Sequence, residues 1–103
     1  MDGKWFMNSS VEIMDKMHET NVYRKEQEYD VAIEKYLELY QAIKNNKEYY
    51  SQHGCEVLKQ LCFCYRKKGD ISEAIESIDE AVRLAYKNSL RYGNGDETSV
   101  LYH

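Results

Sequence analysis

The stretch that decides the fold of this chain is YRKKGDISEAIESIDEAV, residues 65–82. Gly69 suits the left-handed backbone position at which helices commonly end. Asp70, with Glu73 three residues later, is typical of the position that caps the start of a helix. The stretch therefore predicts a helix that ends near residue 68 and another that begins near residue 71. Apolar residues with the three-or-four spacing of one helix face follow at Ile71, Ala74, Ile75, Ile78, Ala81, Val82 and Ala85.

The same pattern occurs 42 residues earlier, in YRKEQEYDVAIEKYLELY, residues 23–40. This correspondence predicts an internal repeat, in which each unit is a pair of helices. The residues that match in register are Tyr23 and Tyr65, Arg24 and Arg66, Lys25 and Lys67, Tyr29 and Ile71, Ala32 and Ala74, Ile33 and Ile75, and Tyr36 and Ile78.

The capping pattern of Ser9 and Glu12 predicts that the first helix begins near residue 9 and runs to about residue 27. Its apolar side is expected to hold Val11, Met14, Met17, Val22 and Tyr23. A second helix is expected from about Tyr29 to Asn45. Its apolar set is too wide for one stripe, which indicates contacts on more than one side.

The second repeat is expected to begin after Asn45 and Asn46, with a helix over about residues 47–68. Gly54 lies inside it, and a loop through residues 51–54 is the alternative. The inward-facing residues of this helix are expected to be Tyr50, Val57, Leu58, Leu61, Cys62 and Tyr65.

These elements predict a helical domain over residues 9–92, with repeats at about 9–45 and 47–91. Residues 1–8 form an N-terminal lead that is either disordered or folded back onto an apolar surface. Residues 93–103 are expected to be a flexible tail.

The composition limits the class of protein. A chain of 103 residues without proline favours a single, helix-rich domain. The net charge of −4 argues against a nucleic-acid-binding surface. Because no apolar run approaches the ~20 residues of a membrane span, and residues 1–8 do not resemble a signal peptide, we expect a cytoplasmic protein without membrane contact.

The helix pairs resemble those of the tetratricopeptide repeat (TPR) family. In the second unit the resemblance rests on Leu58, Leu61, Cys62, Tyr65, Ile71, Ala74, Ile78 and Ala81, and in the first on Thr20, Tyr23, Tyr29, Ala32, Tyr36 and Leu39. Small side chains at Cys62, Ala74 and Ala81 would let the paired helices approach closely. The resemblance implies an all-α fold in which two antiparallel helix pairs stack as a short right-handed superhelix.

The chain departs from that family at several points. Leu39 replaces a small residue, and the repeat period of 42 exceeds the usual 34. A plain four-helix bundle is the alternative architecture.

The sequence offers little for catalysis or metal binding. Cys62 and Cys64 are two apart on a helix, so their side chains point in different directions, and no Cys-x-x-Cys pair occurs. His53 and Cys55 complete the set of candidate ligands, without a recognisable base or phosphate-binding motif nearby. We therefore expect no enzyme, no metal and no cofactor, and reduced thiols.

The TPR resemblance implies an adaptor that binds a peptide or partner helix on the groove side of the first and third helices. Phe63 stands among polar positions, so we expect it to be exposed or to meet a partner. Basic residues at one end would suit an acidic peptide, although cations at helix C-termini also offset the helix dipole. The candidate binding residues are Met14, Met17, His18, Asn21, Arg24, Lys25, Lys59, Gln60, Phe63, Arg66 and Lys67.

The alternative function is self-assembly through the fourth helix. Helical repeats bury their faces against neighbouring repeats, and the last helix here has no successor. We expect its open side to be covered by a second copy, by residues 1–8 or 98–103, or by another partner. The candidate interface residues are Ile78, Val82, Leu84, Tyr86 and Leu90.

Overall fold

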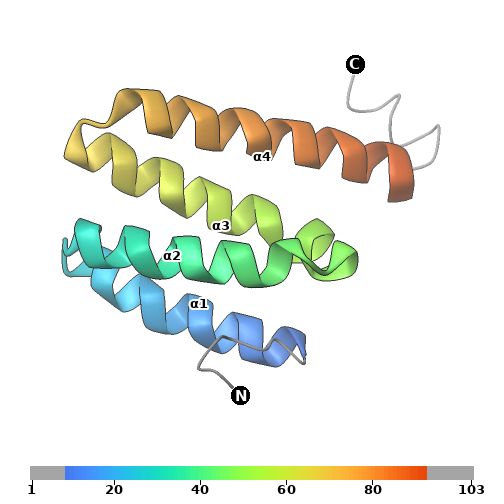
Figure 1. The fold of residues 1–103 in the computed structure, drawn as a ribbon, viewed down its shortest axis with the longest axis horizontal. Helices are drawn as coiled ribbons and strands as arrows, with labels where there is room; N and C mark the ends of the chain where they lie inside the picture. The colour runs from blue at the N-terminus through green and yellow to red at the C-terminus, as the bar shows by residue number, and fades with distance from the viewer. Residues whose placement is uncertain (1–8, 93–103) are drawn as a thin grey trace.

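In the computed structural model, which describes residues 9–92, four α-helices form two antiparallel pairs (Figure 1). The all-α prediction is confirmed, and no β-strand occurs in this part of the chain. Because the third helix continues through residues 51–54, the alternative loop there is wrong. The predictions for residues 1–8 and 93–103 lie outside the described residues. The helices are α1 (Ser10–Lys25), α2 (Tyr29–Lys44), α3 (Lys47–Lys68) and α4 (Ile71–Tyr92).

The turns within the two helix pairs have similar backbone geometry. Gly69 ends α3 with a left-handed φ of 87°, and the N–H of Asp70 donates to the carbonyl of Tyr65 at 2.8 Å. In the first pair, Gln27 has a φ of 66°, and the N–H of Glu28 donates to the carbonyl of Tyr23 at 2.9 Å. Both turns therefore satisfy the last carbonyls of a helix in the same way.

Side chains cap the starts of two helices. The predicted cap Ser9 accepts a hydrogen bond from the N–H of Glu12 at 3.3 Å. Asn46 accepts one from the N–H of Tyr49 at 3.0 Å, so the Asn45–Asn46 break also supplies the cap of α3.

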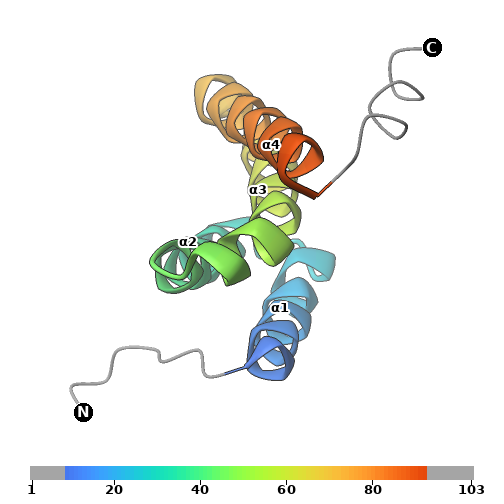
Figure 2. The same ribbon diagram turned by 90° about the vertical axis from the view of Figure 1, so that its right-hand side faces the viewer.

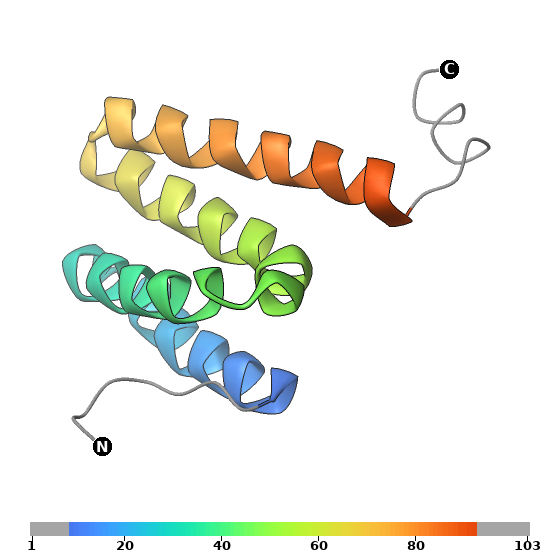
Figure 3. The same ribbon diagram turned by 45° about the vertical axis from the view of Figure 1, so that its right-hand side comes forward.

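The helices lie in a row, with α1 and α4 at its two ends (Figures 1 and 3). α3 packs against both α2 and α4, and α1 packs against α2 and, over a smaller contact, α3. Within residues 9–92, α1 and α4 do not touch, so the four helices do not close into a ring around one core. The end-on view shows α4 at the outer edge of the stack (Figure 2). The right-handed superhelix stays a prediction.

The core is centred on α2, as its wide apolar set predicts. Buried residues of α2 are Ala32, Ile33, Tyr36, Leu39, Tyr40 and Ile43, and those of α3 include Val57, Leu58, Leu61 and Cys64. α3 buries Cys64 and leaves Cys62 half-buried, so the prediction of Cys62 as the small core residue is wrong.

The predicted inner face of α1 is also partly wrong. Val11, Met14 and Val22 are exposed, whereas Ile13 is completely buried and anchors the helix. α1 carries apolar residues on several sides, and only the side that α2 and α3 cover becomes core. The spacing along α1 alone does not distinguish that side.

Candidate partner-binding surfaces

The fourth helix has two apolar faces, and only one of them is covered. Its inner face buries Ala74, Ser77, Ala81 and Leu84. Its outer face carries a row of large apolar residues that are 39–60% exposed. We call this row the apolar stripe; its residues are Ile71, Ile75, Ile78, Val82, Tyr86 and Leu90.

The inner face of α4 is built for close approach to α3. A Cβ atom added to Gly54 would lie 2.7 Å from Cδ2 of Leu84, so a larger residue at this position would collide with α4. The amide of Asn88 donates to the carbonyl of Ser51 at 2.8 Å. Small residues and one leucine thus bring the helices together and leave the larger residues of α4 facing outward.

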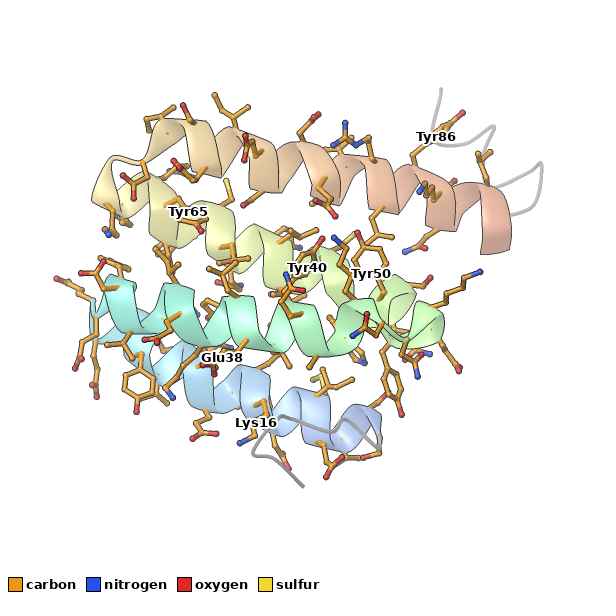
Figure 4. All side chains as sticks on the ribbon, in the orientation of Figure 1. Lys16, Glu38, Tyr40, Tyr50, Tyr65 and Tyr86 are labelled. Carbon is orange, nitrogen blue, oxygen red and sulfur yellow. The ribbon has the colours of Figure 1, made fainter. Side chains whose placement is uncertain are left out.

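The apolar stripe runs the length of α4. Its residues are spaced three or four apart, so they form one continuous face about 30 Å long at 1.5 Å per residue. Tyr86 points away from the other three helices (Figure 4). This geometry matches the anchor spacing with which amphipathic helices bind partner helices.

A cluster of hydroxyl and carboxylate groups fixes the orientation of α4. Tyr40 of α2 and Tyr50 of α3 both donate hydrogen bonds to Oε2 of Glu80, the latter at 2.6 Å. The two tyrosine rings lie 5.9 Å apart, side by side between α2 and α4 (Figure 4). The backbones of α2 and α4 do not come close together within residues 9–92, and the hydrogen bond from Tyr40 to Glu80 links the two helices through their side chains.

The bridge changes the pKa values of its tyrosine and glutamate side chains in opposite directions. The hydrogen bonds from Tyr40 and Tyr50 lower the pKa of Glu80, because they stabilise its charged form. Burial, followed by the contact with Glu80, raises the pKa of both Tyr40 and Tyr50. The bridge is therefore most stable with a charged carboxylate and neutral phenols.

Two shallow cavities flank the bridge. One, of about 170 Å³, is lined by residues of α2, α3 and α4 that include Tyr40, Leu61, Tyr65 and Glu80. The other, of about 270 Å³, is lined by Tyr50, Glu80, Arg83, Leu84 and Lys87. Both are open to solvent and small beside typical ligand pockets.

Part of the predicted groove-side set comes together where the C-terminal ends of α1 and α3 meet. The guanidinium of Arg24 and the ammonium of Lys67 each lie 5.5 Å from the centre of the Phe63 ring. The hydroxyl of Tyr36, a buried residue, donates to Oδ1 of Asn21. The structure therefore joins Asn21, Arg24, Phe63 and Lys67 in one region.

Three predicted contact residues are less available than expected. Met17 is 5% exposed and Leu84 is 5% exposed, because both pack in the core. We therefore withdraw them as partner-binding residues. Phe63 is half-buried against the core and the ring of Tyr29, so it is less exposed than expected, and its contact with a partner stays a prediction.

The other predicted groove-side residues divide by exposure. Gln60 is half-buried and donates to Glu56 at 2.8 Å. Lys59 pairs with the same carboxylate at 3.4 Å. The exposed members of the set are Met14, His18, Lys25, Lys59, Arg66 and Lys67.

Within residues 9–92, no group of three or more histidine, cysteine, aspartate or glutamate side chains is placed to hold a metal ion. Burial raises the pKa of Cys64 to about 11 and also raises the pKa of Cys55, which disfavours the reactive thiolate. Burial lowers the pKa of His53, whose Nε2 lies 3.3 Å from the Ser10 hydroxyl.

No helix within the described part of the chain has the length and apolar content needed to cross a membrane. No protein-family model matches the chain, and no curated protein or solved structure was found to be similar to it.

Sequence reasoning missed two features of these surfaces. It placed Ile75 on the same face as Ala74 and did not include it among the interface residues, whereas Ile75 is 59% exposed. It also did not connect Tyr40 and Glu80, because 40 residues separate them in the chain. The abundance of tyrosine indicated half-buried hydroxyls but not their partners.

Proposed function

We propose that this chain is a protein–protein interaction module whose main contact surface is the apolar stripe of α4. The observation that supports this most strongly is the continuous exposure of six large apolar residues along one helix. Each exposes about half of its surface, and a free residue of this size exposes on the order of 200 Å². The stripe therefore presents roughly 600 Å², the upper end of what monomeric proteins expose.

The rest of α4 supports the same proposal. Val82 and Leu84 are separated by two positions, yet Val82 is 60% exposed and Leu84 is 5% exposed. A helix that served only to cover the core would place its larger apolar residues inward. Here alanine and serine fill most inner positions, and isoleucine, valine and tyrosine remain outside.

An affinity-capture experiment tests this proposal. The bait is the tagged chain, and the sample is an extract of the native cells supplemented with a second copy that carries a different tag. The stripe variant is Ile75→Lys with Val82→Lys. The control is Gln41→Lys with Asn45→Lys, which adds the same charge at exposed positions outside α4.

We expect the wild-type chain and the control to retain at least one protein, the second copy included, that the stripe variant loses roughly tenfold or more. Circular dichroism of each variant checks that the helices are intact. If the stripe variant retains everything that the wild type retains, the proposed function is wrong.

A second candidate function is supported by the basic region where α1 and α3 meet. Lys25, Arg66 and Lys67 are exposed there, beside the partly buried ring of Phe63. A peptide with carboxylate groups would suit this charge. Titration with a glutamate-rich peptide tests it: replacing Phe63 and Arg66 together with alanine should abolish any binding, and a wild-type chain that does not bind would exclude it.

A further inference from the structure

The spacing and the neighbouring charges of the apolar stripe indicate which partner it binds. We infer that the partner is a second copy of this chain, whose α4 packs antiparallel against the first across a two-fold axis. This inference rests on the proposed function of the stripe. The axis would pass close to the peptide bond between Glu80 and Ala81.

The spacing of the stripe is symmetric about that point. In an antiparallel pair of helices, residues at equal distances from the axis lie opposite each other. Ile71 then faces the partner's Leu90, and Ile75 faces the partner's Tyr86. Ile78 faces the partner's Val82 with an offset of one residue, about 1.5 Å along the helix. Every large apolar residue of the stripe thus meets another, as a self-complementary interface requires.

The charges beside the stripe match the same arrangement. Asp79 and Arg83 form an ion pair at 3.2 Å within one helix, and their side chains are 59% and 67% exposed. By helical position both lie along the edge of the stripe that faces away from α3. In the antiparallel pair, Asp79 and the partner's Arg83 lie at nearly the same height along the helix axis, with an offset of less than about 2 Å.

Because of the two-fold axis, Arg83 also faces the partner's Asp79, so the dimer contains two contacts between opposite charges. Glu76, on the same edge in the acidic half of α4, adds a negative charge near the partner's Arg83. A parallel pair would instead place Asp79 against Asp79 and Arg83 against Arg83 of the other copy. Charge complementarity therefore selects the antiparallel arrangement.

The size of the stripe predicts a reversible dimer. Standard interfaces bury about 800 Å² on each partner, and the stripe offers roughly 600 Å². α4 lies at the end of the row of helices, so no other helix of the described residues 9–92 lies in the path of a second copy (Figure 1). We expect dissociation constants on the order of micromolar.

Sedimentation equilibrium of the purified chain, over a concentration range of roughly 1–300 µM, tests the inference. The wild type should dimerise, and Val82→Lys should be monomeric. Asp79→Arg and Arg83→Asp should each weaken the dimer roughly tenfold or more, because each places like charges in contact twice. The double variant Asp79→Arg/Arg83→Asp should bind at least about threefold more tightly than either single variant, because it restores the two contacts between positions 79 and 83, although Glu76 then faces a negative charge.

The outcomes separate this inference from the proposed function. A wild-type chain that stays monomeric, while the affinity capture still finds a stripe-dependent protein, overturns the self-pairing and leaves the proposed function standing. A double variant as weak as the single ones overturns the antiparallel arrangement. A dimer that persists in Val82→Lys, together with unchanged capture, overturns both. Melting curves of all variants confirm that each is folded.

Discussion

Replacing Glu80 with glutamine tests the bridge that holds α4 in place. The substitution keeps the shape of the side chain and an oxygen that can accept a hydrogen bond, but removes the charge. Tyr40, which is 6% exposed, and Tyr50 both donate to Glu80, so the change weakens two contacts at once.

The expected magnitude follows from the difference between charged and neutral hydrogen bonds. A bond to a charged group contributes about 1.5–3 kcal/mol and a neutral one about 0.5–1.5 kcal/mol, so two weakened bonds would cost roughly 2 kcal/mol if fully buried. Glu80 is only half-buried, and water screens its charge. We therefore expect Glu80→Gln to lower the free energy of unfolding by about 1 kcal/mol at neutral pH, and the melting temperature by roughly 4–8 °C.

The effect should depend on pH with a defined sign. The pKa of Glu80 is lowered in the folded chain from its usual value of 4.5, so the unfolded chain takes up this proton first as the pH falls. The stability contributed by the charge is complete above pH 4.5 and is lost as the pH falls through the lower, folded value. The difference between wild type and Glu80→Gln should therefore shrink in that acidic range.

Chemical denaturation followed by circular dichroism, at neutral and acidic pH, measures both quantities. Glu76→Gln is the matched control, because it removes an exposed carboxylate one turn earlier on α4 and should change stability by no more than about 0.5 kcal/mol. Equal stability of the two variants at neutral pH would refute the role of the bridge. A difference from wild type that does not shrink in acid would refute its electrostatic origin.

The remaining predictions concern turns and packing, and the same denaturation assay measures each. Gln27→Gly should stabilise the chain by about 0.5–1 kcal/mol by relieving a left-handed backbone, and Gly69→Gln should destabilise it by about 1–2 kcal/mol; equal signs would contradict the repeated turn geometry. Gly54→Val should destabilise by about 2 kcal/mol, since even its Cβ would lie 2.7 Å from Leu84; an unchanged midpoint would show that α4 can move away. Leu84→Ala should cost about 2–4 kcal/mol and Val82→Ala no more than about 0.5 kcal/mol in dilute solution, and the opposite order would reverse the assigned faces of α4.

Most of the secondary structure could be predicted from short sequence patterns, such as residues that cap a helix or end it. The sequence predicted the limits of α3 at about residues 47 and 68, because the Asn45–Asn46 break precedes the helix and a glycine follows it. Gly69 adopts the left-handed conformation that its position implies. Such signals act within a few residues, so they are visible without knowledge of the tertiary structure.

Site residues were harder to predict, because exposure depends on which neighbour covers a helix. Met17 of α1 is buried under α2 and α3, whereas Met14, three residues earlier, is 44% exposed. Both are methionines, and both fit the three-or-four spacing of apolar residues along α1. The sequence identifies an apolar helix, but it does not say how many of its sides another helix will cover.

The sequence by itself determined that this chain is helical, that its helices are joined by short turns, and that residues 65–82 share a pattern with residues 23–40. These properties depend on backbone preferences and on apolar periodicity, both of which are local. Only the tertiary structure decided which face of α4 is covered. Gly54 of α3 lies against Leu84, on the side of α4 that also buries Ala74 and Ala81, and the bridge from Glu80 to Tyr40 and Tyr50 links that helix to α2 and α3. The isoleucine and valine side then faces solvent, where it forms the surface proposed to bind a second copy.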